Sequence, residues 1–231
     1  MKWVWSVCAA LLCLAASARG EGVENLIKQL KSPEASTRRT AAKALGEAGP
    51  GAREAVGALA DALKDSDSFV RRFAAQALGE IGPAARDAVP ALTKALNDSR
   101  REVQEAAAAA LGKIGASSVQ SLITVAKDPR KEAMVRLKAV ESLAAMHAAG
   151  RLAVPGLVEI ISGKPGKGGK KQIDPNLDVR VAAVNALGQI AAPDDKAALD
   201  ALTALTDKKQ NNRALKQAAN VALRKIKNNS K

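Results

Sequence analysis

One nine-residue string, A-A-x-A-L-G-x-[AI]-G, occurs three times in this chain, beginning at Ala41, Ala74 and Ala107. Looser copies follow, and successive central leucines are separated by 33, 33, 32, 44 and 36 residues. These leucines are Leu45, Leu78, Leu111, Leu143, Leu187 and Leu223. A period of this length is typical of stacked supersecondary units that cannot bury their apolar faces alone. The sequence therefore predicts an extended array of repeats, a form that serves more often as a binding surface than as an enzyme.

Each repeat contains two segments with helical periodicity. In the second unit the first segment carries Val56, Leu59 and Leu63, and the second carries an apolar stripe over residues 70–81 at positions i, i+3, i+4, i+7, i+8 and i+11. Glycine follows the stripe at positions 49, 82 and 115, where a helix C-cap needs positive φ. Pro50 and Pro83 come next and cannot continue a helix. Each unit is therefore predicted to be a helical hairpin.

Polar residues mark the start of the second helix in each unit. Ser32, Asp128 and Asp174 each stand before a proline. We expect these side chains to cap the second helix, with the proline in its first turn. Residues 65–67 and 97–99 supply capping oxygens in the other units.

The stretch 68–82, SFVRRFAAQALGEIG, followed by AVPAL at 88–92, resembles a HEAT repeat, in particular the short HEAT-like type of phycobilisome bilin lyases. The resemblance covers residues 22–228. It implies an all-α, right-handed α-α superhelix (solenoid) of about six helical hairpins, whose second helices line the concave face. The units are approximately 22–51, 52–84, 85–116, 117–149, 150–192 and 193–228.

The first eighteen residues form a separate segment. Lys2 precedes an apolar run over residues 4–16, and Ala16-Ser17-Ala18 fits an A-x-A cleavage site. This pattern predicts a secretory signal peptide over 1–18 that is removed near Ala18, leaving a repeat domain over 19–231 in the periplasm or outside the cell. The apolar run is too short to span a bilayer as a helix.

The chain is strongly basic and its charge is uneven. The net charge is +13, and it is about +12 without Lys2. Residues 151–231 hold 15 basic and 7 acidic side chains, whereas residues 19–150 hold 20 and 16. The charge suggests a protein partner with an acidic surface, an anionic envelope polymer or a membrane surface. It equally fits solubility with weak nonspecific binding.

The fifth unit contains an insertion of about eleven residues that includes the basic loop 163–172. Four lysines without an acid stand among glycines and prolines there: Lys164, Lys167, Lys170 and Lys171. We expect a mobile cationic loop that grips an acidic partner, or else a tolerated surface insertion. Its spacing differs from that of a phosphate-binding P-loop.

Arginines recur near the start of the second helices. They are Arg38, Arg39, Arg71, Arg72, Arg136 and Arg180, and Gln104 takes the place in the third unit. One interpretation is a ladder of ion pairs with acids in neighbouring turns, such as Asp67 or Asp98, which offsets the unfavourable helix dipole. The other is a basic groove formed by Arg39, Lys43 and Arg72.

Nucleic acid is not the predicted partner. Single-strand binders stack bases on aromatic side chains, and we assign Phe69 and Phe73, the sole aromatic residues after position 18, to the core. No motif that enters a duplex groove is present.

Catalytic chemistry has little support in the sequence. The chain has one histidine, His147, which we interpret as a surface residue, and no cysteine after position 18. We predict no enzyme activity, metal or cofactor. A lyase-like or enzyme-accessory role is a remote alternative.

The sequence thus predicts a monomeric, exported scaffold that binds a protein along its concave face. The predicted contact residues are Arg39, Lys43, Arg72, Gln76, Glu105, Glu141 and Asn185. The alternative is a basic module that attaches to an anionic polymer or membrane surface.

Overall fold

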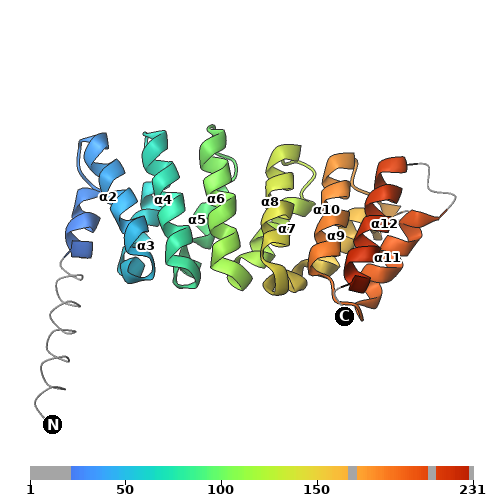
Figure 1. Ribbon diagram of the computed structural model, residues 1–231. Helices are drawn as coiled ribbons and strands as arrows, with labels where there is room; N and C mark the ends of the chain where they lie inside the picture. The colour runs from blue at the N-terminus through green and yellow to red at the C-terminus, as the bar shows by residue number, and fades with distance from the viewer. Residues whose placement is uncertain (1–21, 166–170, 208–211, 229–231) are drawn as a thin grey trace, which may run out of the picture.

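The chain folds into helical hairpins that stack side by side along one direction (Figure 1). The computed structural model describes residues 22–165, 171–207 and 212–228. Within these ranges six hairpins follow one another, which confirms the predicted all-α solenoid. The predicted signal peptide lies outside the described residues.

The second helices of the hairpins form one row, and the first helices lie behind it in Figure 1. The front row packs in chain order, each helix against the next. It consists of α2 (Ala35–Ala48), α4 (Ser68–Ile81), α6 (Arg101–Ile114), α8 (Ala133–Ala145), α10 (Leu177–Ile190) and α12 (Arg213–Asn228). The rear row consists of a helix over 22–29 and of α3 (Val56–Ala62), α5 (Val89–Ala95), α7 (Val119–Lys127), α9 (Val154–Ser162) and α11 (Lys196–Thr206).

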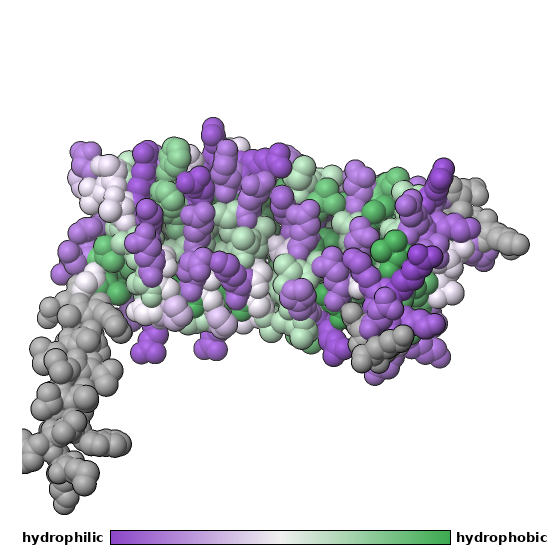
Figure 2. Space-filling view, in the orientation of Figure 1, coloured by the Kyte–Doolittle hydropathy of each residue, from purple (hydrophilic) through white to green (hydrophobic). Residues whose placement is uncertain are grey.

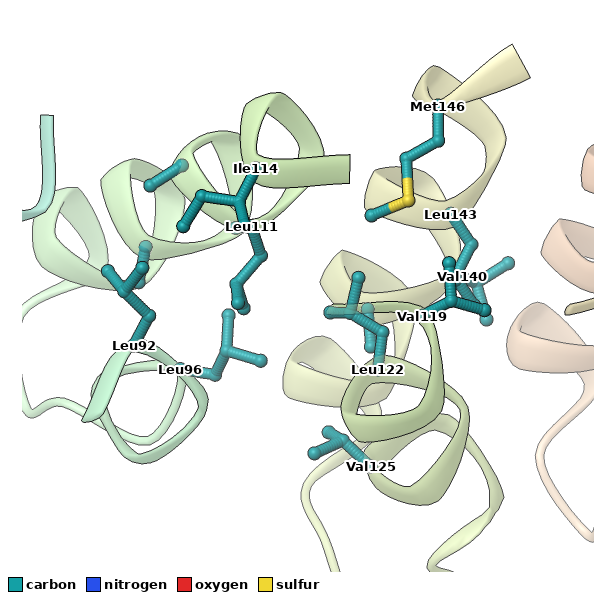
Figure 3. Close-up of a cluster of buried hydrophobic side chains, with 14 of the residues drawn as sticks. Leu92, Leu96, Leu111, Ile114, Val119, Leu122, Val125, Val140, Leu143 and Met146 are labelled. Carbon is teal, nitrogen blue, oxygen red and sulfur yellow. The ribbon is translucent and has the colours of Figure 1, made fainter. Parts of the chain in front are cut away.

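The repeated leucines form the centre of the core between the two rows. Leu45, Leu78, Leu111, Leu143 and Leu187 are fully buried. In Figure 3, Leu92 of α5 and Leu96, the residue after its end, lie below Leu111 of α6, and Val119 and Leu122 of α7 lie beside Leu143 of α8. Each hairpin therefore covers its apolar stripe with its own two helices and with those of its neighbours.

Small residues let the front helices approach closely. A Cβ added to Gly79 of α4 would lie 3.0 Å from Cα of Ala110 on α6. This contact is tighter than ordinary van der Waals separation, so the alanines and glycines of the repeat set the spacing of the row.

Short 3₁₀ segments join the hairpins: η1 (Gly49–Ala55), η2 (Gly82–Ala88), η3 (Gly115–Ser118) and η4 (His147–Ala153). Gly49, Gly82 and Gly115 begin the first three with φ of 54°, 71° and 79°, as the C-cap prediction required. His147 occupies the same position in the fourth with φ of 47°.

The predicted helix starts are partly wrong. Asp67 caps α4 and accepts hydrogen bonds from the backbone N–H groups of Phe69 and Val70. Ser32, Asp128 and Asp174 instead accept from the N–H group two residues later, and the prolines that follow them precede the helix. Asp65 and Asp98 make the same turn. A short polar side chain before proline closes such a turn as readily as it caps a helix, which explains the error.

The insertion of the fifth unit is partly regular. β1 (Lys164–Pro165) pairs antiparallel with β2 (Lys171–Gln172), with Lys164 opposite Gln172. The rest of the predicted basic loop, including Lys167 and Lys170, lies outside the described residues.

Candidate functional site

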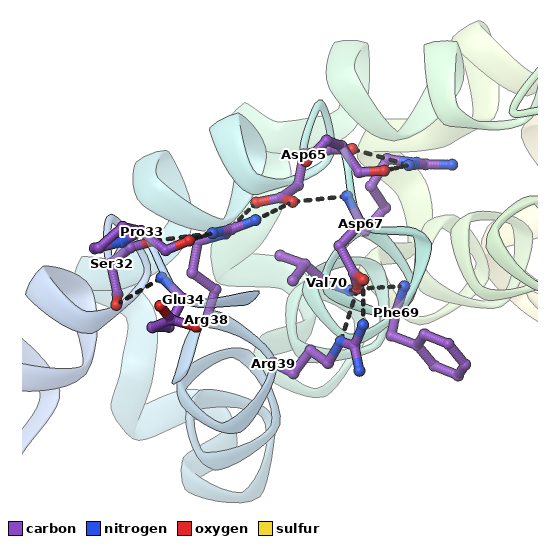
Figure 4. Close-up of polar contacts among 11 residues, drawn as sticks. Ser32, Pro33, Glu34, Arg38, Arg39, Asp65, Asp67, Phe69 and Val70 are labelled. Atoms are coloured by element: carbon purple, nitrogen blue, oxygen red, sulfur yellow. Dashed lines mark hydrogen bonds and ion pairs between the residues drawn. The ribbon is translucent and has the colours of Figure 1, made fainter. Parts of the chain in front are cut away.

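Arginines of the front helices reach the turns of the following hairpin. In Figure 4, Arg38 and Arg39 of α2 point toward Asp65 and Asp67, which stand in the turn before α4. Arg38 donates from Nε and Nη2 to both carboxylate oxygens of Asp65, at 2.6 and 2.8 Å. One repeat later Arg71 makes the same two hydrogen bonds to Asp98. The predicted ladder of ion pairs is confirmed for Arg38, Arg39, Arg71 and Arg136. Within the described part of the chain, Arg72 and Arg180 make no such pair.

These arginines also hold the turn of their own hairpin. Nη1 of Arg38 donates to the carbonyl oxygens of Ser32 and Pro33, each at 2.9 Å. Arg71 donates in the same way to the carbonyls of Asp65 and Ser66. A single guanidinium therefore fixes the turn of one unit and the aspartate of the next, so its role is structural.

The ladder is interrupted at the third unit. Gln104 donates to the carbonyl oxygen of Asp98 at 2.7 Å but, being uncharged, cannot form the ion pair to the next turn. Asp128 of that turn pairs with Arg130 instead. The ladder resumes where Arg136 of α8 pairs with Asp174, with both side chains almost fully buried. Among the described residues, the junction between α6 and α8 therefore lacks the arginine–aspartate pair that the ladder forms between α4 and α6 and between α8 and α10.

A groove crosses the front row over α2, α4 and α6, with a volume of about 850 Å³. Its floor is formed by small residues, among them Gly46, Ala77, Gly79, Ala106, Ala109 and Ala110. Figure 2 shows this face, on which hydrophilic side chains project along the helices with paler, more apolar surface between them. An adjoining hollow of about 510 Å³ continues between α6 and α8 and shares Glu105, Ala109 and Lys113 with the groove.

The charges that line the groove are mixed. Four carboxylates (Glu47, Glu80, Glu102 and Glu105) stand against three cations (Lys43, Arg72 and Lys113). Ion pairs across the row connect Lys113 to Glu80 at 2.6 Å and Lys138 to Glu105 at 3.7 Å. Hydrogen bonding to Arg101 lowers the pKa of Glu105, so this carboxylate is ionised at neutral pH. The groove is therefore lined by charges of both signs, in contrast to the expected basic groove.

Two phenylalanines, Phe69 and Phe73, stand at one end of the groove. Phe69 is 48% exposed, and Phe73 is partly buried and lines the groove. The guanidinium carbon of Arg72 lies 5.4 Å from the centre of the Phe69 ring and 4.8 Å from that of Phe73. Arg39 lies 4.8 Å from the Phe69 ring. The assignment of Phe69 to the core was wrong, because Phe69 lies outside the apolar stripe of α4 that begins at Val70. Phe73 belongs to that stripe and packs against the core while it also lines the groove.

Four of the predicted contact residues line the groove: Lys43, Arg72, Gln76 and Glu105. Glu141 lines the adjoining hollow. Asn185 is exposed on α10 but does not line either hollow. Arg39 is paired with Asp67 and also lies outside the lining.

The basic excess of the C-terminal part is not carried by its described side chains. Of the 15 basic residues in 151–231, seven have side chains outside the described part, and the remaining eight stand against seven acids. The seven are Lys164, Lys167, Lys170, Lys171, Lys208, Lys209 and Lys231. The described surface over these repeats is therefore close to neutral.

Several residues of the groove and its edge escaped the sequence prediction, notably Phe69 beside the lining and Phe73, Glu80 and Lys113 within it. Helical spacing could have found the first two. Phe69, Arg72, Phe73 and Gln76 stand at i, i+3, i+4 and i+7 and so share one face of α4. Glu80 and Lys113 are 33 residues apart, one repeat, and pair because the repeats stack in register.

The described residues contain no cluster of three or more histidine, cysteine, aspartate or glutamate side chains placed to hold a metal ion. His147 is exposed in η4. Within the described ranges, every helix falls short of the length and apolar character that a membrane span requires.

Solved structures of repeat proteins are similar to this chain. An engineered protein is 24% identical over 90% of this chain and 97% of its own, with a TM-score of 0.49. A computationally designed armadillo repeat protein for modular peptide recognition is 21% identical over 87% and 98%, with a TM-score of 0.45. The complex of CpcE and CpcF of phycocyanin lyase from Nostoc sp. PCC7120 contains a chain that is 23% identical over 88% and 94%, with a TM-score of 0.44.

No curated protein matches the sequence. A family model of HEAT repeats matches residues 23–99 and 89–167, which together exceed half of the chain, and a model of the PBS lyase HEAT-like repeat matches 179–208. With its stacked helical hairpins, the chain belongs to the HEAT-repeat family.

Proposed function

We propose that this protein is a non-enzymatic scaffold that holds a segment of a partner protein in the groove over α2, α4 and α6. The observation that carries the proposal is the groove itself, about 850 Å³ in volume, with an alanine and glycine floor between charged walls. A floor without long side chains leaves room for the backbone and side chains of a bound segment.

The charge pattern of the lining supports a protein partner over a polyanion. Four carboxylates face the groove, and a polymer of uniform negative charge would be repelled by them. A protein segment carries both charges and apolar groups and can match such a surface. The acidic partner suggested by the net charge of the chain is therefore replaced by one of mixed character.

Steric blocking of the groove tests the proposal. Ala109 of α6 is exposed and lines both hollows, so Ala109→Trp fills the binding surface without entering the core. Tagged wild-type and variant chains are expressed in the native host, and captured proteins are compared after low-salt and high-salt washes. We expect one partner to survive the high-salt wash with wild type and to be lost with Ala109→Trp.

A matched variant controls for the effect of an added indole. Ala204 is equally an exposed alanine, but it lies on α11 in the rear row. Ala204→Trp should capture the partner like wild type. Equal capture by Ala109→Trp and wild type would refute groove binding, and a diffuse set lost at high salt would favour charge-driven attachment through the lysine-rich segments.

We also propose that the protein is exported, on the basis of the charged, apolar and A-x-A segments of residues 1–18. Fractionation of host cells tests this step. The exported form should begin near residue 19 by N-terminal sequencing, and full-length protein in the cytosolic fraction would contradict it.

A further inference from the structure

Arg72 is an arginine whose expected partner in the ladder is missing. Arg39, one repeat earlier, pairs with Asp67, the residue that caps α4. The residue 33 positions after Asp67 is Arg100, which takes the corresponding place before α6. The repeat therefore puts a cation where Arg72 would need a carboxylate.

The guanidinium of Arg72 is held in place without using its donors. Within the described part of the chain it makes no hydrogen bond or ion pair, and its Nε is buried and unsatisfied. Phe69 and Phe73 hold the guanidinium by cation–π attraction, but an aromatic ring does not satisfy the planar N–H donors as a carboxylate does. This leaves a positioned guanidinium with free donors at one end of the groove.

The other charged side chains of the lining already have partners. Lys113 pairs with Glu80, Lys43 lies 3.7 Å from Glu47, and Glu105 pairs with Arg101. Of the charged side chains that line the groove, Arg72 alone lacks an opposite charge. An incoming segment therefore meets one unmatched positive group at this end, beside the half-exposed ring of Phe69.

We infer that Arg72 is a carboxylate-binding subsite of the groove and selects a partner segment with an aspartate or glutamate side chain, or a chain terminus, at this point. The inference rests on the proposed function and adds the chemistry of its ligand. A carboxylate suits the planar donors of a guanidinium by forming two parallel hydrogen bonds. A single carboxylate also fits the four acids of the lining better than a polyanion does.

Side-chain NMR with peptide probes tests the subsite directly. The Nε–H signal of Arg72, assigned by its loss in Arg72→Lys, is followed during titration of the purified protein with Ac-Ala-Ala-Glu-Ala-Ala-NH2. We expect a saturable shift, and at least tenfold weaker binding of the corresponding glutamine peptide. A penta-alanine peptide with a free C-terminus shows whether a chain terminus is preferred to a side chain. Equal binding of the glutamate and glutamine peptides, or tighter binding of heparin than of the glutamate peptide at this signal, would overturn the inference.

Restoring the ladder provides a competitor inside the protein. Arg100→Asp places a carboxylate where the repeat predicts a partner for Arg72, so it should weaken binding of the glutamate peptide at least tenfold. Arg100→Asn provides a helix cap without the charge and should bind the peptide nearly like wild type. Arg130→Asp makes the same charge change in the turn before α8 and should have little effect. Unchanged peptide binding by Arg100→Asp would count against the subsite.

Failure of this inference can be told from failure of the proposed function. If partner capture is lost with Ala109→Trp but is the same for Arg72→Gln and wild type, the groove binds a partner and the proposed carboxylate subsite is wrong. If capture is unaffected by Ala109→Trp, the proposed function itself is wrong, whatever the peptides do.

Discussion

The guanidinium of Arg71 on α4 donates two hydrogen bonds, of 2.7 and 2.8 Å, to the carboxylate of Asp98 in the turn before α6. Only 13% of the Arg71 side chain and 10% of the Asp98 side chain are exposed. The same arginine holds the two carbonyl groups of its own turn. One side chain thus joins two hairpins through a mostly buried ion pair and holds the turn between the helices of its own hairpin.

Arg71→Ala should lower the free energy of unfolding by about 2–3 kcal/mol, because it leaves the mostly buried Asp98 carboxylate and two backbone carbonyls without their donor. Urea unfolding followed by circular dichroism measures the change. A double-mutant cycle with Asp98→Ala should give a coupling energy above about 1 kcal/mol.

The exposed pair Lys64–Asp61 is the control for this experiment. The two groups are 3.6 Å apart, and their side chains are 73% and 84% exposed. Lys64→Ala should change stability by less than about 0.5 kcal/mol. A comparable loss in both variants would mean that the ladder contributes no more than a surface pair.

Asp67 should make the free energy of unfolding depend on pH in the acidic range. The hydrogen bond from Arg39, aided by the N–H groups of Val70 and Phe69, holds the pKa of Asp67 at about 2, below its ordinary value of 3.8. Because the folded pKa is depressed, this contribution is complete above about pH 4 and is lost as pH falls toward 2. After allowance for solvent screening it is on the order of 1 kcal/mol.

Asp67→Asn isolates this contribution, because asparagine still caps a helix but does not titrate. Urea midpoints at pH 7, 4, 3 and 2.5 should fall less steeply for the variant than for wild type. Parallel curves would show that Arg39 and Asp67 are not coupled in solution.

Structural features that recur in every repeat could be predicted from the sequence. The six hairpins, the buried leucines such as Leu78 and the glycine C-caps such as Gly82 follow from packing and backbone rules that act within one repeat. Pairing of the arginines with acids such as Asp98 was also predicted, because acids recur in the turns before the second helices, and the Arg71–Asp98 pair confirms it.

The residues that line the groove were harder to predict, because the lining depends on which side chains of different repeats lie next to each other. Phe69 was assigned to the core on hydrophobicity, yet it lies beside Arg72, one helical turn away. The charge of the whole chain gave no guide to the lining, since its C-terminal excess is concentrated in segments such as 164–171 rather than on the described helices.

His147→Gly should stabilise the protein. His147 has φ of 47° at the position where Gly49, Gly82 and Gly115 end the earlier repeats, and left-handed backbone costs a residue with Cβ about 1–2 kcal/mol. The greater freedom of glycine in the unfolded chain offsets part of this gain. A rise of up to about 1 kcal/mol in unfolding free energy is expected.

The neighbouring exposed residue controls for the entropy of glycine. Ala148 is not among the described residues with positive φ, so Ala148→Gly should lower stability by about 0.5–1 kcal/mol. If His147→Gly also lowers it, contacts of the imidazole outweigh the backbone strain.

Gly188→Ala should loosen the last helix. A Cβ at this position of α10 would lie 2.8 Å from Cα of Ala222 on α12, so the two helices must separate, at a cost of about 1–3 kcal/mol. Because α12 ends the array and has a neighbour on one side only, amide hydrogen exchange should speed up over residues 213–228 more than over α4.

The control is Gly57→Ala on α3, where nothing lies within 4 Å of the added Cβ and helix propensity should raise stability by up to about 1 kcal/mol. Faster exchange spread evenly over all repeats would mean that the array unfolds as a single unit, and that close packing of α10 on α12 is not a local determinant.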